Sequence, residues 1–109
     1  MEGKKSKVFV NKSYGKVRFC ACCDKFEIHY KNLIFCFEES KYAEFIRTID
    51  EVSGGFDLKQ HISDEFVFSF DNSSVKSVLT GFDLIQLNEL INEAEAERTL
   101  ESYLKLLDN

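Results

Sequence analysis

The sequence predicts an α+β fold in which a single antiparallel sheet of about six strands carries two helices on one face. Three observations support this fold class. Segments in which apolar and polar residues alternate fill residues 7–37 and recur over residues 66–79, as in half-buried strands. Segments with apolar residues at helical spacing follow them over residues 41–52 and 82–107. A shift of 40 residues brings the two patterns into coincidence, which indicates two ββα-like units, the first with two additional strands.

The length of 109 residues predicts one domain that spans residues 1–109. Hydrophobic residues make up 44% of the chain and include 11 phenylalanines, enough for a sizeable core. We expect the first unit at residues 7–52, a connector at residues 53–64 and the second unit at residues 65–109. Residues 1–6 are expected to be disordered.

The first four strands follow from a test of strand register. They are predicted at Lys7–Asn11, Lys16–Cys20, Phe26–Tyr30 and Leu33–Phe37. A two-residue turn at Lys31-Asn32, with four-residue loops after Cys20 and before Lys16, places the apolar residues on one face of a meander. The predicted pairs are Tyr30–Leu33, Ile28–Phe35, Phe26–Phe37, Phe19–Phe26, Val17–Ile28, Val10–Val17 and Val8–Phe19.

One face of the predicted sheet is apolar and the other is mixed. The residues expected on the apolar face are Val17, Phe19, Phe26, Ile28, Phe35, Phe37, Phe66 and Phe68. The residues expected on the mixed face are Phe9, Arg18, Glu27, His29, Ile34 and Cys36. Arg18 and Glu27 are expected to form a cross-strand charge pair there. Ile28 lies between Val17 and Phe35, in the middle of the face that the helices should cover.

The first helix is predicted at Lys41–Val52, because its apolar residues recur at helical spacing. Ser40 is the expected N-cap, and Gly54-Gly55 should end the helix. The second unit repeats this order, with strands at Phe66–Phe70 and Val75–Leu79 on either side of a turn at Asp71-Asn72.

A long final helix is predicted at Phe82–Leu107, with Thr80 as its cap and Asp83 placed as in a capping box. At ~1.5 Å per residue this helix is roughly 40 Å long, more than a domain of this size can cover. Its last part carries a second apolar stripe: Leu100, Tyr103, Leu104 and Leu107. Either this stripe forms the interface of a homodimer, or the helix bends near Ala96 and folds back over its own sheet.

The charge balance excludes some classes of partner. The chain has 14 basic and 19 acidic residues, a net charge of −5, whereas phosphate binding needs an excess of Lys and Arg. We therefore expect no nucleic acid as partner. No apolar run reaches the ~18 residues of a membrane span, and the N-terminus does not read as a secretory signal. We expect a cytoplasmic protein with no membrane association.

Cys20, Cys22 and Cys23 form a cluster, C-A-C-C, in the loop between two predicted strands. Reduced thiols that serve as small apolar residues are the favoured interpretation, with a zinc site or a reactive thiol as the alternatives. In a metal site, Cys20 and Cys23 are the expected ligands, with Cys22 pointing elsewhere, because an i, i+3 pair can chelate one ion from a tight turn. Cys36 lies roughly 11–12 Å from Cys20 in the predicted sheet, which is wide for ligands of one ion unless the loop folds back. Two such knuckles that meet across a dimer axis would supply four ligands. No helix N-terminus is available to lower a thiol pKa.

The stretch Cys20–Phe45 reads C-A-C-C-D-K-F-E-I-H-Y-K-N-L-I-F-C-F-E-E-S-K-Y-A-E-F. It resembles a family of small uncharacterised proteins from Bacteroidetes, in which a C-x-x-C knuckle precedes a hairpin with Asn in its turn and a capped helix. A second, similar half of that pattern ends in a long helix. Cys20, Cys23 and Asn32 match the pattern. The resemblance implies a bacterial cytoplasmic protein with Cys20 and Cys23 as a pair, and it implies no activity.

The leading functional prediction is a non-enzymatic interaction or regulatory module that self-associates as a homodimer. It depends on the second apolar stripe and on the lack of a predicted catalytic constellation. His29 is expected on the mixed face and His61 in the connector, and no nucleophile can be placed beside either from the sequence. The alternatives are a zinc-binding protein that uses Cys20 and Cys23, and a thiol redox protein. The sequence indicates no particular protein partner.

Overall fold

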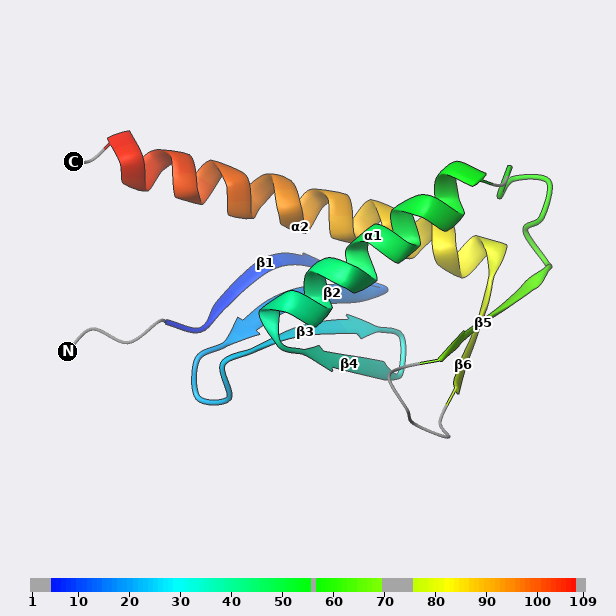
Figure 1. The fold of residues 1–109 in the computed structure, drawn as a ribbon, viewed down its shortest axis with the longest axis horizontal. Coiled ribbons are helices and arrows are strands. Elements are labelled where there is room, and N and C mark those ends of the chain that lie inside the picture. The colour runs from blue at the N-terminus through cyan, green and yellow to red at the C-terminus, as the bar shows by residue number, and fades with distance from the viewer. Residues whose placement is uncertain (1–4, 56, 70–75, 108–109) are drawn as a thin grey trace.

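The structure, a computed structural model, describes residues 5–55, 57–69 and 76–107 (Figure 1). Its elements are β1 (Lys7–Lys12), β2 (Gly15–Cys20), β3 (Lys25–Tyr30), β4 (Leu33–Phe37), α1 (Glu39–Gly55), β5 (Glu65–Ser69), β6 (Lys76–Thr80) and α2 (Gly81–Leu107). The predicted α+β class is confirmed. Four predicted features lie outside the described residues: the disorder of residues 1–4, the end of one strand at Phe70, the turn at Asp71-Asn72 and the start of the next strand at Val75.

The prediction of a single six-stranded sheet is wrong. Strands β1 to β4 form one antiparallel meander in sequence order, and β5 and β6 form a separate two-stranded sheet. The start of α2 holds this hairpin at the end of the molecule, where the Gly81 and Phe82 backbone N–H groups donate to the carbonyls of Asp64 and Ile62. Figure 1 shows the β5–β6 hairpin beside the end of the meander, below the first turns of α2. The alternation of apolar residues shows which face of a strand is buried but not which strand lies beside it. The sequence pattern therefore could not show that β5 and β6 form a sheet of their own.

The predicted register is confirmed for strands β2, β3 and β4. The confirmed pairs are Tyr30–Leu33, Ile28–Phe35, Phe26–Phe37, Phe19–Phe26 and Val17–Ile28, together with Val10–Val17 between β1 and β2. The turn before β2 is shorter than predicted, because Lys12 already pairs with Gly15. Turn length and side-chain period jointly specify register where one face is buried.

A β-bulge in β1 overturns the remaining predicted pair. Val8 lies opposite Arg18 instead of Phe19, because the register shifts just after Val8. A bulge places an extra residue in one strand and reverses the alternation of its side chains. Val8 is therefore exposed, whereas Phe9 packs against the core with its ring 6.4 Å from that of Phe26. The expectation of Phe9 on the mixed face is wrong for this reason.

The apolar face of the meander and the two helices share one core. Val17 and Ile28 are fully buried, as the predicted face requires. Of the other residues predicted there, Phe19, Phe26 and Phe35 are buried, while Phe37, Phe66 and Phe68 are half-buried and pack against the core. On the opposite face, Arg18 Nε lies 3.2 Å from Glu27 Oε1, which confirms the predicted charge pair.

Helix α1 begins two residues earlier than predicted. The Tyr42 N–H donates to the Glu38 carbonyl at 2.8 Å, so Ser40 lies inside the first turn and is not the N-cap. The helix also includes Gly54 and Gly55, which were expected to end it. Its buried residues are Tyr42, Phe45 and Ile49.

Helix α2 runs unbroken from Gly81 to Leu107, and Figure 1 shows no bend near Ala96. Its start has the predicted capping box: the Thr80 N–H donates to Asp83 Oδ2 at 2.9 Å, and the Asp83 N–H donates to Thr80 Oγ1 at 3.1 Å. The assignment of one helix to each hairpin is wrong, because α2 packs on β1 and β2 as well as on β6, and on α1. Helix α1 covers β3 and β4, so both helices lie on the same side of the meander (Figure 1). No helix among the described residues has the length and apolar character needed to cross a membrane.

Candidate functional site

The loop between β2 and β3 carries the cysteine cluster at one end of the meander. Cys20 is the last residue of β2 and pairs with Lys25, so the connection is the predicted four-residue loop. Asp24 closes this loop with a left-handed backbone (φ 54°), a conformation that Asp tolerates better than most residues. The Ala21 N–H donates to Ser6 Oγ at 2.9 Å, which ties the loop to the segment before β1.

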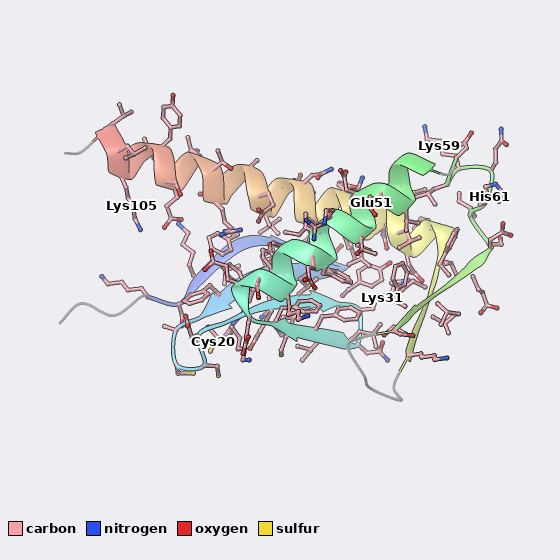
Figure 2. The ribbon with its side chains drawn as sticks, in the orientation of Figure 1. Cys20, Lys31, Glu51, Lys59, His61 and Lys105 are labelled. Atoms are coloured by element: carbon pink, nitrogen blue, oxygen red, sulfur yellow. The ribbon has the colours of Figure 1, made fainter. Side chains whose placement is uncertain are left out.

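The loop brings three thiols together (Figure 2). The Sγ atom of Cys20 lies 3.1 Å from that of Cys22 and 3.7 Å from that of Cys23, and the Sγ atoms of Cys22 and Cys23 lie 3.5 Å apart. The expectation that Cys22 points elsewhere is therefore wrong. All four cysteines are free thiols, and Cys36 lies exposed on β4, outside this cluster. The prediction favoured the i, i+3 pair and left Cys22 out. The direction of the Cys22 side chain depends on the backbone conformation of the loop, which the spacing of the cysteines does not reveal.

The three thiols differ in exposure and in acidity. Cys20 is 5% exposed, whereas Cys22 and Cys23 are exposed. Hydrogen bonds from the Cys22 thiol, from the Cys23 backbone N–H and thiol, and from Arg18 lower the pKa of Cys20 to about 7, against the opposing effect of burial. Hydrogen bonds to Cys22 and Cys20, with the negative charge of their thiolates, raise the pKa of Cys23 to about 11. Neighbouring side chains thus lower a thiol pKa here without a helix N-terminus.

The distances between the sulfur atoms match a metal centre. Tetrahedral zinc with Zn–S bonds of ~2.3 Å holds its sulfur ligands about 3.8 Å apart. The Cys20–Cys23 and Cys22–Cys23 distances of 3.7 and 3.5 Å are close to this value, and the Cys20–Cys22 distance of 3.1 Å is shorter. Among all Cys, His and acidic side chains of the described residues, these three cysteines have ligand atoms close enough together to bind one ion.

The two histidines do not join the cysteines. His29 Nε2 lies 2.9 Å from Glu27 Oε1 on the mixed face, as expected. His61 Nδ1 lies 2.6 Å from Asp64 Oδ2 in the connector. Figure 2 shows His61 and Cys20 at opposite ends of the molecule. Among the described residues, both histidines contact carboxylates, and neither histidine belongs to the cluster of three cysteines.

A hydrogen-bond network that the sequence did not reveal lies at the start of α2. The Tyr30 hydroxyl lies 2.7 Å from Asp83 Oδ1 and 2.6 Å from Gln86 Oε1, and Lys31 Nζ lies 3.0 Å from the same Asp83 oxygen. Burial and the Asp83 carboxylate raise the pKa of Tyr30. The network joins the β3–β4 turn to the N-terminus of α2, and its side chains are engaged with one another, so we assign it a structural role.

The second predicted site, the stripe on the last part of α2, is exposed. The exposed fractions are 53% for Leu100, 63% for Tyr103, 53% for Leu104 and 71% for Leu107. Leu106, at 72%, adds to the same end of the helix. Each of these five side chains is more than 50% exposed. Monomeric proteins rarely leave a contiguous apolar surface of this kind open to solvent.

Comparison with known proteins identifies the family. The profile of a family of unknown function (DUF6686) matches residues 1–108. The chain belongs to this family. No curated protein and no solved structure matches it. The resemblance to a family without assigned activity is confirmed at this level, and the description of DUF6686 names no function.

Proposed function

We propose that this protein binds a thiophilic metal ion, zinc, through Cys20, Cys22 and Cys23. The single observation that supports this is the convergence of three Sγ atoms within 3.7 Å of one another. Three thiols that only filled space would gain nothing from this convergence, because apolar packing does not require sulfur atoms to face one another. The proposal extends the predicted Cys20–Cys23 pair by one ligand.

The surroundings of the cluster favour thiolates, which are the form that binds metal. Arg18 and the Cys23 backbone N–H both stabilise the charged form of Cys20. Cys20 also ends β2, where it is buried beside Phe19 and pairs with Lys25, so the backbone on one side of the site is held before any ion arrives. A preformed ligand lowers the entropic cost of binding.

The proposed site has an open side. Cys22 and Cys23 are exposed, and a zinc ion held by three protein ligands completes its tetrahedron with water or with a ligand from another molecule. This arrangement suits exchangeable binding more than a closed structural site. The cluster requires reduced thiols, which supports the predicted cytoplasmic location. The Bacteroidetes origin stays a prediction from the resemblance.

Metal analysis of protein purified without chelator tests the proposal. We expect about one zinc per chain in the wild type, and a loss of most of that zinc in the C20S/C23S and C22S variants. The Cys36→Ser variant is the matched control, because Cys36 lies outside the cluster, and it should keep its zinc. Zinc that survives the C20S/C23S substitution would show that the ion is held elsewhere.

A second proposed function, the leading prediction from the sequence, is self-association through the stripe on α2. The exposure of Leu100, Tyr103, Leu104 and Leu107 supports it, together with the unbroken course of the helix, which leaves the stripe without a fold-back partner. A two-fold contact between terminal helices would bury the stripes of both chains. In sedimentation at micromolar concentration, we expect a dimer that L100K/L104K converts to a 12.6 kDa monomer. A wild-type monomer at this concentration would refute the homodimer.

A thiol redox role is less well supported by the same geometry. The thiol with the lowered pKa belongs to Cys20, which is 5% exposed and therefore shielded from a disulfide or peroxide substrate. Reaction of the folded protein with a thiol reagent distinguishes the two roles. A metal site predicts that zinc protects all three cysteines together, whereas a redox site predicts preferential reaction of one cysteine that zinc does not affect.

A further inference from the structure

A groove unrelated to the metal site lies between the beginning of β1 and the last part of α2. Its volume is about 720 Å³, within the ~300–1,000 Å³ typical of small-molecule sites. Figure 1 shows the reason for its position: α2 continues past the sheet and stands away from the start of β1. The apolar stripe of the previous section contributes no residue to the lining of this groove.

The groove has an aromatic floor made by Phe9, Phe19 and Phe26. The rings of Phe19 and Phe26 lie 5.1 Å apart, and the rings of Phe9 and Phe26 are stacked at 6.4 Å. Phe9 reaches this position because of the β-bulge, since regular alternation would have turned it to the opposite face of the sheet. The bulge thus brings Phe9, which is half-buried, to the groove, whereas Phe19 and Phe26 beneath it are only 7% and 6% exposed.

The walls of the groove carry more positive than negative charge. Lys5, Lys7, Arg98 and Lys105 line it against two acidic residues, Glu39 and Glu101, in a chain whose net charge is −5. Figure 2 shows Lys105 extending from α2 toward the side on which β1 lies. Cations gathered over an aromatic floor in an acidic protein complement a ligand that is both apolar and anionic.

Arg98 is the cation that the structure holds most firmly. Its guanidinium lies 4.7 Å from the centre of the Phe26 ring, and its Nη1 contacts both carboxylate oxygens of Glu95 at 3.0 Å. The contacts with Glu95 engage only Nη1, and a guanidinium has five N–H donors in a fixed plane. A positioned arginine above an aromatic floor is suited to a carboxylate whose apolar body lies on the rings.

We propose that this groove binds a small organic carboxylate with an aryl or alkyl body, with Arg98 at the carboxylate and Phe9, the least buried of the three rings, under the apolar part. An inorganic anion would leave the aromatic floor unused, and a neutral apolar molecule would leave the cations unused. A peptide with an apolar C-terminal residue presents the same chemistry, and β1, whose first residues line the groove, is an edge strand of the meander. The volume of the groove is that of a small-molecule site, so we assign the ligand to a small molecule, and addition of a peptide strand along β1 would contradict this assignment.

Three probes with a phenyl ring on an alkyl chain of similar length test the charge requirement: phenylbutyrate, its isosteric amide phenylbutyramide, and phenylbutylamine. In titrations followed by NMR of the full chain, we expect saturable binding of phenylbutyrate, with shifts centred on Phe9, Phe19 and Arg98. Binding of the neutral amide should be about tenfold weaker, and the amine weaker still, because the amide loses a charge-assisted hydrogen bond. Equal affinity for the three probes, or no saturable binding of phenylbutyrate, would overturn the proposal, as would shifts centred on the stripe residues Leu100, Tyr103, Leu104 and Leu107 and absent from the residues that line the groove.

Variants locate the ligand in the groove. R98Q and K7Q should each weaken phenylbutyrate binding by about tenfold, and K59Q should leave it unchanged, because Lys59 lies in the connector at the far end of the molecule (Figure 2). Thermal unfolding of each variant shows whether it is folded, and K7Q serves if R98Q is not. The C20S/C23S protein should bind phenylbutyrate as the wild type does, so failure of the metal proposal leaves this one standing. A loss of binding in K59Q equal to that in K7Q would place the ligand elsewhere.

Discussion

Single residues contribute unequally to the stability of this fold, and burial decides which of them matter. Ile28 and Ile34 show the contrast, because they have similar side chains on neighbouring strands. Ile28 is fully buried in the middle of the meander, whereas Ile34 is 60% exposed on the mixed face. The same register that buries one residue exposes the other.

Ile28→Ala is expected to destabilise the protein by roughly 2–5 kcal/mol, because it removes buried apolar atoms and leaves a cavity. Ile34→Ala is the matched control and should change the free energy of unfolding by no more than about 0.5 kcal/mol. Urea denaturation of both variants measures the two changes. Similar losses in the two variants would contradict the assignment of the faces.

The Asp83 carboxylate predicts a dependence of stability on pH. Burial opposes its ionisation, but hydrogen bonds from the Thr80 backbone and from Tyr30 and Lys31 prevail and lower the pKa of Asp83 to about 2. A lowered pKa in the folded state means that the stabilisation is present above pH ~4 and is lost as the pH falls towards 2. We expect Asp83 to contribute about 1 kcal/mol, a value reduced for solvent screening.

Comparison with Asp83→Asn isolates this contribution from the other acidic groups. The difference in unfolding free energy between wild type and D83N should be largest near pH 6 and smaller by about 1 kcal/mol near pH 2.5. Denaturant titrations at the two pH values give the difference. A constant difference across this range would show that the carboxylate is not held in its charged form by the fold.

At the scale of elements, the ends of the two helices differ in what holds them. Helix α2 begins with a reciprocal capping box between Thr80 and Asp83. Helix α1 begins at Glu39, the carbonyl of the preceding Glu38 accepts the first helical hydrogen bond, and Ser40 is exposed inside the first turn. Thr80 therefore caps α2, whereas Ser40, which also belongs to a residue type that often caps helices, does not cap α1.

Thr80→Ala should cost about 1 kcal/mol, the usual value for loss of an N-cap. Ser40→Ala should change stability by less than about 0.5 kcal/mol, since its hydroxyl does not cap α1. Thermal or urea denaturation of the two variants separates these expectations. A loss of about 1 kcal/mol in S40A would restore Ser40 as the cap of α1.

The shape of the whole molecule follows from the length of α2. The radius of gyration is 15.0 Å, compared with about 13 Å for a compact domain of this size, and the longest dimension is 47 Å. The helix passes over β1 and β2 and continues beyond them. This extension creates two surfaces at once: the groove above the aromatic floor and the exposed stripe proposed as an interface.

Zinc should stabilise the whole molecule if it binds the native cluster. At a free concentration 100 times its dissociation constant, a ligand that binds only the native state adds about 2.7 kcal/mol to the free energy of unfolding. We expect zinc to raise the melting temperature of the wild type and of C36S, and a chelator to reverse the shift. The C20S/C23S variant should not respond, and an equal shift in that variant would mean that zinc acts at another site.

The sequence by itself determined the local features of this protein. The register of β2, β3 and β4, the buried face around Ile28 and the cap of α2 all follow from side-chain period, turn length and residue type. These are properties of neighbours in the chain, because a strand exposes alternate residues to opposite faces and a cap needs one side chain near one backbone N–H. The Cys20–Cys23 spacing likewise pointed to the loop in which three thiols lie close together.

Only the tertiary structure decided how distant parts meet. It separated β5 and β6 from the meander, laid α2 across β1 and β2, and turned Phe9 inward at a bulge. It also turned the Cys22 side chain toward Cys20 and Cys23. These outcomes depend on competition among long-range contacts and on the backbone angles of one loop, and alternation of apolar residues carries information on neither.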